Sequence, residues 1–228
     1  MKETIATIPI NDIFAENDGC PICRMTALLE KNAVEYITGP AMMMPEVRVE
    51  TNKKGFCHRH LSQMISCGKR LSNALTLETH LQELAETCIP ADKDGKIDKK
   101  RLKQLSEVNR SCFVCDRIEL EAAHLYDTVC SHWSEDAEFR KIYANQKYIC
   151  LKHYYKLITF AQENMKKKFL PDFCKATSEL TFGYVKELKG DLAHFCSMFD
   201  YRSKGEDFGN SKDSIERALT FLTGCDLP

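Results

Sequence analysis

The sequence predicts an all-α protein, a helical bundle built from two repeated CxxC…CxxH metal-binding halves plus a C-terminal helix. Apolar residues recur at three- and four-residue intervals along much of the chain, and the period-two alternation of strands is almost absent. A CxxC motif followed by a CxxH motif occurs twice at nearly equal spacing. Such self-similarity is typical of a duplicated unit.

The composition is that of an ordinary globular protein. The chain has 228 residues, of which 43% are hydrophobic and 29% charged, enough for one large domain or two small ones. The formal net charge of -1 argues against a global basic surface for nucleic acid or an anionic membrane. The first 18 residues lack the apolar core of a signal peptide, and no apolar run approaches the ~20 residues of a membrane helix. We therefore expect a cytoplasmic protein.

The first half contains three predicted helices after a short helical lead-in. The expected helical segments cover residues 8–14, 24–37, 57–66 and 71–88. Leu28 and Tyr36 give the helix at 24–37 a partial apolar face, and Gly39-Pro40 ends it. Leucines recur at helical spacing in the helix at 71–88, and Pro90 stops it.

The second half repeats this order of helices. The expected segments cover residues 116–130, a short helix ending at 142, 150–165 and 171–195. Ser134 or Asp136 can cap the short helix, and Phe173 begins a buried seam with three- and four-residue spacing. In the tail, Asn210 or Ser211 is predicted to cap a last short helix that Gly224 closes.

The tail also contains the segment Asp200-Tyr201-Arg202. We expect a local ion pair between Asp200 and Arg202 and a packed Tyr201 that anchors the last helix, because local pairs are common on protein surfaces. The alternative is that these side chains form a polar pocket or a partner-docking surface.

We expect four segments along the chain, although they could form one continuous domain. They are the first repeat at 1–90, a polar linker at 91–103, the second repeat at 104–195, and a tail with a helix at 196–228. The repeat extends beyond the ligands, since Glu46-Val47-Arg48 matches Glu138-Phe139-Arg140. The aspartates of the linker resemble a calcium loop, but Arg101 stands where that loop needs a bidentate Glu.

The CxxC and CxxH motifs predict two Cys3His metal sites. A CxxC turn brings two thiolates together, and the two side chains of CxxH share one face of a helix. Three sulfurs and one nitrogen form a normal closed zinc site. Pairing within each half predicts one site of Cys20, Cys23, Cys57 and His60, and another of Cys112, Cys115, Cys150 and His153. The alternative is exchange, in which each CxxC meets the CxxH of the other half.

The repeat alignment distinguishes the ligands from the other cysteines and histidines. His60 aligns with His153, whereas His58 aligns with Leu151 and is not expected to be a ligand. The remaining cysteines are predicted to be small core residues: Cys67, Cys88, Cys130, Cys174, Cys196 and Cys225. Four histidines are predicted to be surface or hydrogen-bonded core groups: His80, His124, His132 and His194.

The ligand types favour two zinc ions as the cofactors. An iron–sulfur cluster is the alternative, because the chain has 12 cysteines and His replaces Cys in some clusters. No phosphate-binding loop or nucleotide-binding glycine motif is present, and no catalytic residue or organic-cofactor site is assigned.

The same residues resemble a family of uncharacterised bacterial Cys/His-rich proteins, the domain of unknown function 6062. The likeness rests on Cys20-Pro21-Ile22-Cys23, on Gly55-Phe56-Cys57 with His60, on the second CxxC and CxxH, and on the ending from Phe195-Cys196 to Asp213. It extends over nearly the whole chain. It implies a complete bacterial protein with a defined tail, and it implies no activity.

A closed four-ligand site has no open position for a substrate, so we expect a binding or regulatory module rather than an enzyme. Its partner would be a protein, and an exposed apolar helix face would permit a homo-oligomer. Nucleic acid and membrane are disfavoured as partners by the near-neutral charge. The alternatives are an iron–sulfur redox protein or enzyme, and a thiol-based sensor in which oxidation ejects zinc and opens one half.

Overall fold

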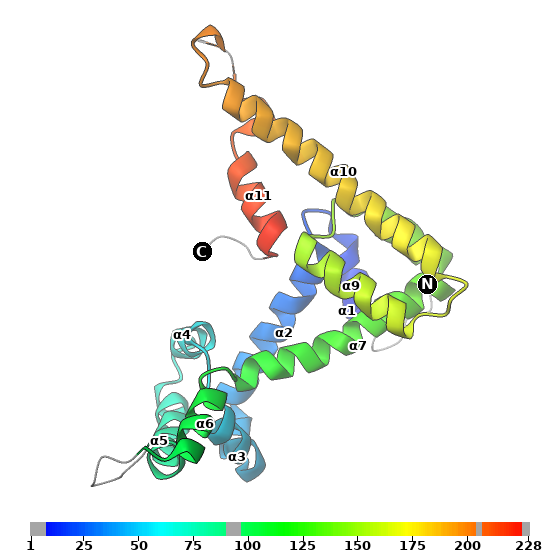
Figure 1. The fold of residues 1–228 in the computed structure, drawn as a ribbon. Helices are drawn as coiled ribbons and strands as arrows, with labels where there is room; N and C mark the ends of the chain where they lie inside the picture. Colours follow the sequence, from blue (N-terminus) through cyan, green and yellow to red (C-terminus); the bar gives the residue numbers. More distant parts are fainter. Residues whose placement is uncertain (1–7, 90–96, 204–206, 225–228) are drawn as a thin grey trace. The chain divides into compact units, whose positions relative to one another are not determined.

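The computed structural model describes residues 8–89, 97–203 and 207–224 (Figure 1). Within these ranges the secondary structure consists of eleven α-helices and three short 3-10 helices, with no strand. The predicted all-α class is therefore confirmed. Residues 91–96 of the expected linker and Cys225 lie outside the described residues. No helix in the described part of the chain has the length and apolarity needed to cross a bilayer.

The chain divides into two compact units. Unit 1 comprises residues 1–26 and 123–228, and unit 2 comprises residues 27–122. The boundaries fall inside two long helices, α2 (Pro21–Thr38) and α7 (Phe113–Glu135). Unit 1 thus contains the first CxxC and the second CxxH, and unit 2 contains the other two motifs.

Unit 1 has an aromatic core. Besides the first turns of α2 and most of α7, it contains α1 (Ile8–Ala15), α8 (Ala137–Ala144), α9 (Leu151–Asn164), α10 (Leu170–Ser197), η2 (Tyr201–Ser203), η3 (Gly209–Ser211) and α11 (Ser214–Thr223). Phe14 contacts Phe139 and Tyr143 with ring centroids 5.1 and 5.9 Å apart, and Phe173 lies 5.7 Å from Tyr143. All four rings are buried, and the hydroxyls of Tyr143 and Thr177 hydrogen-bond at 2.9 Å. These contacts join α1, α8 and α10 around one apolar centre.

The helix α10 buries the seam that its spacing predicts. Phe173, Thr177, Tyr184 and Leu188 are all buried on this face. The short helix α8 is capped by Asp136, whose carboxylate accepts hydrogen bonds from the backbone N–H groups of Glu138 and Phe139. Both features confirm the sequence prediction for these helices.

The helix α11 packs against α10 and α9 (Figure 1). Arg217 of α11 pairs with Asp191 of α10 at 2.8 Å. The predicted closing residue Gly224 has a φ of 67°, as expected for a helix C-cap. The predicted N-cap is wrong: α11 begins at Ser214, and the Ser211 hydroxyl instead donates to the Phe208 carbonyl within η3.

The tail segment before α11 is only partly as predicted. Arg202 and Asp200 form a local ion pair at 3.5 Å, as expected. Tyr201, however, is 82% exposed, and the Arg202 guanidinium lies 5.4 Å from its ring centroid. The expectation that Tyr201 anchors α11 is therefore wrong. Its ring adds little apolar burial in this position.

Unit 2 is organised around the second part of α2 and the start of α7. Its other elements are η1 (Pro40–Met43), α3 (Pro45–Lys54), α4 (His58–Ser66), α5 (Arg70–Thr87) and α6 (Lys99–Val108). Ala33, Val34 and Ile37 of α2 are buried with Met64 of α4 and Val114 of α7. This core fixes the N-termini of α4 and α7 near one another.

Two helices of unit 2 lie where no helix is expected from the sequence. The helix α3 buries only Val47 and Thr51, so it has no apolar stripe that periodicity could detect. It is attached to α5 by Arg48, which donates to the Leu75 carbonyl at 2.6 Å. The helix α6 begins at Lys99, inside the expected linker, and has no buried residue. Its start is stabilised by Asp98, which accepts from the Lys100 backbone N–H.

Candidate metal centres

The eight predicted donors lie in two groups that cross the sequence halves. Cys20, Cys23, Cys150 and His153 form the unit-1 cluster, and Cys57, His60, Cys112 and Cys115 form the unit-2 cluster. Within each cluster, one potential ligand atom per residue lies within 4.8 Å of all the others. The predicted pairing within each half is therefore wrong, and the exchange alternative describes the structure.

Helix length explains why pairing within a half fails. Each CxxC motif stands at the start of a long helix, α2 with 18 residues or α7 with 23. At 1.5 Å per residue these helices carry the chain about 27 and 35 Å away from their cysteines. The following helices α3 and α8 have 10 and 8 residues and are too short to return the chain. Each CxxH therefore meets the CxxC of the other half.

All four motifs use a helix N-terminus in the same way. One cysteine of each CxxC directly precedes the helix, and its second cysteine lies in the first turn. In each CxxH the cysteine is the N-cap, with similar backbone angles for Cys57 (φ -73°, ψ 163°) and Cys150 (φ -66°, ψ 158°). Free backbone N–H groups and the helix dipole stabilise negative charge at these ends. The helix ends thus place partial positive charge beside the sulfurs of both clusters.

In the unit-1 cluster the ring nitrogen Nδ1 of His153 faces three sulfurs. It lies 3.2 Å from the Cys150 Sγ, 3.3 Å from the Cys23 Sγ and 3.8 Å from the Cys20 Sγ. The Sγ atoms of Cys23 and Cys150 are 3.6 Å apart. Cys20, Cys150 and His153 are at most 4% exposed. The donors converge on one point inside unit 1.

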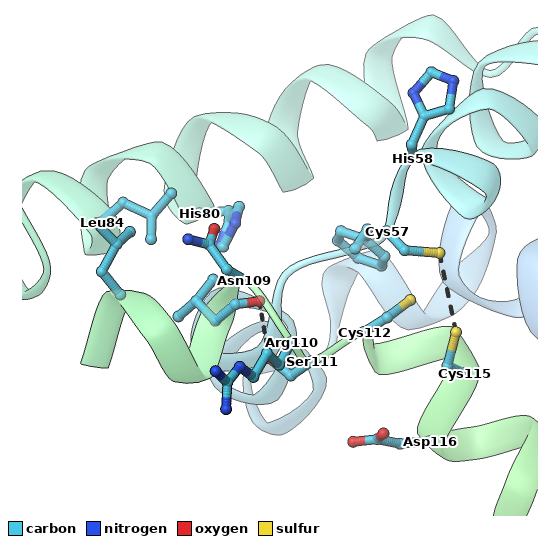
Figure 2. A pocket seen from close by; sticks show the side chains of 13 residues that line it. Cys57, His58, His80, Leu84, Asn109, Arg110, Ser111, Cys112, Cys115 and Asp116 are labelled. Carbon is cyan, nitrogen blue, oxygen red and sulfur yellow. Dashed lines mark hydrogen bonds between the residues drawn. The ribbon is translucent and has the colours of Figure 1, made fainter. Parts of the chain in front are cut away.

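The unit-2 cluster has the same arrangement. The His60 Nδ1 lies 3.2 Å from the Sγ atoms of Cys57 and Cys112 and 3.4 Å from that of Cys115. The Sγ atoms of Cys57 and Cys115 are 3.9 Å apart. Figure 2 shows the side chains of the three cysteines turned toward one another from α4 and α7.

These distances fit one small tetrahedral ion in each cluster. With bonds of about 2.3 Å to sulfur and about 2.0 Å to nitrogen, neighbouring donors of a tetrahedral zinc ion lie roughly 3.5 to 3.8 Å apart. The closest donor pairs are 3.2 to 3.9 Å apart, and all four donors of each cluster lie within 4.8 Å of one another. Both clusters therefore have the donor set and the spacing to hold a metal ion.

The close sulfurs also favour a cation electrostatically. Burial raises the pKa of Cys115 to about 12, and the neighbouring Cys112 and Cys57 add to the effect. In the unit-1 cluster, a hydrogen bond with Cys20 contributes most to raising the pKa of Cys150 to about 12. Several thiolates in so small a space repel one another, and a divalent cation among them offsets that repulsion.

Behind the unit-2 cluster, Glu30 orients the histidine. The His60 Nε2 donates to Glu30 Oε1 at 2.9 Å, and Arg59 donates to Glu30 Oε2 at 2.7 Å. Burial lowers the pKa of His60 although Glu30 acts in the opposite direction, so the ring is neutral near pH 7. With the proton on Nε2, the Nδ1 lone pair faces the sulfurs. A carboxylate on the far ring nitrogen is typical of metal-ligating histidines.

Sequence reasoning missed Glu30, although the sequence contains a signal for it. Glu30 precedes Ala33, Val34 and Ile37 by three, four and seven residues, so a charged side chain lies on the buried face of α2. Leu28, which is expected from the sequence to lie on the apolar face of this helix, is instead 42% exposed. A buried carboxylate needs a partner, and His60 and Arg59 supply it.

A glycine lies close to the cysteine of each CxxH motif: Gly55 near Cys57 in unit 2 and Gly224 near Cys150 in unit 1. In unit 2, Gly55 has a φ of 61°, and its carbonyl accepts from the Phe113 N–H at 3.0 Å, which joins the segment before Cys57 to the residue that follows Cys112. A Cβ at Gly55 would lie 2.8 Å from the His80 Nε2. His80 is itself a hydrogen-bonded core group, as expected, because its Nδ1 lies 2.8 Å from the Asn52 carbonyl.

In unit 1 the end of α11 packs directly on the cluster. The Cys23 thiol donates to the Gly224 carbonyl at 3.4 Å. A Cβ at Gly224 would lie 3.0 Å from the Cys150 Sγ. Phe221, one turn earlier, stacks edge-on against Tyr148 with ring centroids 5.7 Å apart. The C-terminal helix thus covers the unit-1 cluster and needs a glycine to do so.

A comparison with protein families matches residues 1–227 to a family of unknown function, DUF6062. The chain belongs to this family. The resemblance expected from the cysteine motifs is therefore confirmed. Comparisons with curated proteins and with solved structures give no match.

A pocket of about 480 Å³ opens beside the unit-2 cluster (Figure 2). Cys57, Cys112 and Cys115 form part of its lining. Cys115 is exposed and Cys57 partly exposed, whereas Cys112 is buried. His58 is an exposed residue at the pocket and, as expected, does not join the donors of the cluster. Two of the three sulfurs of this cluster are therefore accessible from solvent.

The other described cysteines only partly follow the expectation of small core residues. Cys88 and Cys130 are buried, and Cys174 is partly buried. Cys67 and Cys196 are exposed, so the expectation is wrong for them. Cys67 is the C-cap of α4, and Cys196 lies in the exposed last turn of α10. Neither position faces the core.

Proposed function

We propose that the chain is a zinc-binding protein in which each Cys3His cluster holds one structural ion. The observation that carries the proposal is the convergence of three sulfurs and one imidazole nitrogen within 4.8 Å in each cluster. Thiolate and neutral imidazole are ligands that zinc prefers, and four protein donors complete its tetrahedral shell. On this proposal Cys20, Cys23, Cys150 and His153 bind one ion, and Cys57, His60, Cys112 and Cys115 bind the other.

The donor spacing supports a single ion over an iron–sulfur cluster. In such a cluster the four protein ligands are divided among at least two iron atoms, so they do not all converge on one point. Here all four donors of each cluster lie within 4.8 Å of one another, with the Cys23 and Cys150 sulfurs 3.6 Å apart and the Cys57 and Cys115 sulfurs 3.9 Å apart. Zinc also needs no change of oxidation state to act as a cross-link.

The role of each ion is to connect parts of the chain that are distant in sequence. The unit-1 cluster joins residues up to 133 positions apart, and the unit-2 cluster joins residues up to 58 positions apart. Each cluster also joins two helix N-termini, of α2 and α9 in unit 1 and of α4 and α7 in unit 2. Metal binding at such a site contributes directly to the free energy of folding.

We further infer that this zinc-stabilised fold serves as a binding or regulatory module with a protein partner. Four protein ligands leave no coordination position for a substrate, which favours binding over catalysis. A net charge of -1 disfavours nucleic acid. The cytosol is the proposed location, because a reducing compartment keeps thiolates available to a metal.

The deciding experiment is the metal content of the anaerobically purified full-length chain, measured by mass spectrometry together with a visible absorption spectrum. We expect two zinc ions per chain and no visible absorption bands. Removal of the metal with a chelator should then lower the thermal unfolding midpoint. Iron with sulfide-type absorption would overturn the zinc assignment, and an unchanged midpoint without metal would overturn the structural role.

A further inference from the structure

The two clusters differ in how well they are shielded from solvent. In unit 1, Cys20 and Cys150 are buried and the end of α11 lies on Cys23 and Cys150. In unit 2, Cys115 is exposed, Cys57 is partly exposed, and both line the 480 Å³ pocket. Oxidants reach exposed thiolates more readily than buried ones. The two clusters have the same types of ligand, but the unit-2 cysteines are more accessible to oxidants than the unit-1 cysteines.

The accessible sulfurs of unit 2 are also adjacent. The Cys57 Sγ and Cys115 Sγ lie 3.9 Å apart, and both residues line the pocket (Figure 2). A disulfide needs about 2.05 Å between sulfurs, so a shift of roughly 2 Å would close the bond. The two cysteines come from the N-termini of α4 and α7, and Cys112 lies deeper in the cluster. The pocket gives a small hydroperoxide a direct approach to them.

We propose that the unit-2 cluster is a peroxide-responsive zinc switch, in which Cys57 and Cys115 form a disulfide and release the ion while the unit-1 ion stays bound. This inference rests on the proposed zinc binding and assigns its regulation to one of the two sites. The reactive ligand class is a hydroperoxide, with hydrogen peroxide as the simplest member.

The chemistry takes two steps and balances. The Cys115 thiolate attacks one peroxide oxygen, the O–O bond breaks, and a sulfenic acid forms while the released hydroxide takes a proton to become water. The Cys57 thiolate then attacks the sulfenic sulfur, the S–S bond forms, and the second oxygen leaves as water after taking a proton. The two sulfurs together lose two electrons, which reduce the peroxide to two water molecules.

Disulfide formation removes two of the four ligands from the ion. Only Cys112 and His60 then remain as donors, and two ligands hold zinc far more weakly than four. The ion leaves, and the wall of the pocket that Cys57 and Cys115 form changes with it. A thiol reductant with added zinc reverses the change. The unit-1 cluster provides an internal reference within the same molecule.

The test uses the full-length chain with its zinc content measured first. The protein is titrated with hydrogen peroxide, released zinc is quantified with a chromogenic chelator, and disulfides are located by peptide mass spectrometry. We expect release of one zinc ion per chain together with a Cys57–Cys115 disulfide, and rebinding after reduction. Release of both ions together, release of none, or a disulfide elsewhere would overturn the switch.

The starting metal content separates this inference from the proposed function. A chain without zinc before oxidation contradicts the proposed zinc binding, whereas a two-zinc chain without selective release contradicts only the switch. Two variants assign the labile ion: Cys150→Ser should leave one peroxide-labile ion, and Cys112→Ser should leave one resistant ion. The opposite pattern would contradict the proposal.

As matched controls, Cys67→Ser and Cys196→Ser remove exposed thiols outside the clusters and should leave the peroxide-induced release of zinc unchanged.

Discussion

Glu30 and His60 are joined by a hydrogen bond of 2.9 Å between the carboxylate Oε1 and the ring Nε2, on the side of the ring opposite the three sulfurs of unit 2. The carboxylate is nearly buried, and Arg59 donates to its other oxygen. Because the hydrogen bond keeps the proton on Nε2, it presents the Nδ1 lone pair to the metal position. Glu30 is thus a positioning residue of the unit-2 cluster.

Replacing this carboxylate should weaken zinc binding in unit 2 alone. We expect Glu30→Gln to lower the zinc affinity of the unit-2 cluster roughly 10- to 100-fold, the usual effect of losing such a partner. Competitive titration with a zinc chelator would resolve the two sites. The exposed Glu35 on the same helix provides the control, and Glu35→Gln should bind like the unchanged protein. Equal weakening of both sites would contradict the positioning role.

Double variants distinguish the exchanged grouping from pairing within each half. Cys20→Ser and His153→Ala remove ligands of the same cluster, so the double variant should still hold one zinc ion. Cys20→Ser combined with His60→Ala removes a ligand from each cluster and should hold none. Zinc counted by mass spectrometry after gel filtration gives the readout. Pairing within the halves would give the reverse result for the two combinations.

The sequence predicts the main helices because their determinants are local. The stripe of Phe173, Thr177 and Tyr184 and the closing Gly224 are readable in the sequence, and the structure has both. The helix α3 escapes prediction because it is mostly polar and depends on contacts such as that of Arg48 with α5. Periodicity cannot detect a helix that is stabilised by tertiary hydrogen bonds.

The ligands of the metal centres are likewise predictable as motifs, but their grouping is not. Cys57 and Cys150 stand in equivalent motifs, and nothing local assigns either to a particular CxxC. The grouping follows from the lengths of α2 and α7, which carry the chain away from Cys23 and Cys115. It is a property of the whole chain path. For Glu30 the sequence shows a charged residue on the buried face of α2, but it does not show the partner, because His60 lies 30 residues later.

A side chain at Gly224 should disturb the unit-1 cluster. In Gly224→Ala the residue keeps a φ of 67°, which costs about 1 to 2 kcal/mol for a non-glycine residue. The new Cβ would also lie 3.0 Å from the Cys150 Sγ. We expect a lower thermal midpoint and weaker zinc binding in unit 1, measured by calorimetry and chelator competition.

The control for this variant is Gly190, which lies inside α10 with nothing within 4 Å of a Cβ position. Gly190→Ala should be neutral or slightly stabilising, because alanine favours the helix. A Gly224→Ala protein with unchanged midpoint and zinc affinity would contradict the close packing of α11 on the cluster.

The raised pKa of Cys130 predicts how the free energy of unfolding changes at alkaline pH. This buried thiol is outside both clusters, and burial, with Asp127 and Cys174 nearby, raises its pKa to about 12. In the unfolded chain a thiol titrates near a pKa of about 8.5. The folded state therefore holds the proton more tightly, and its contribution to stability is fully present below about pH 8.5. That contribution is lost as the pH rises from there toward 12.

The free energy of unfolding should thus fall across this window, and Cys130→Ala should show a shallower fall in denaturant titrations at several pH values. A Cys67→Ala control, which removes an exposed thiol, should keep the slope of the unchanged protein. Identical slopes for all three proteins would show that the buried thiol does not govern the alkaline transition.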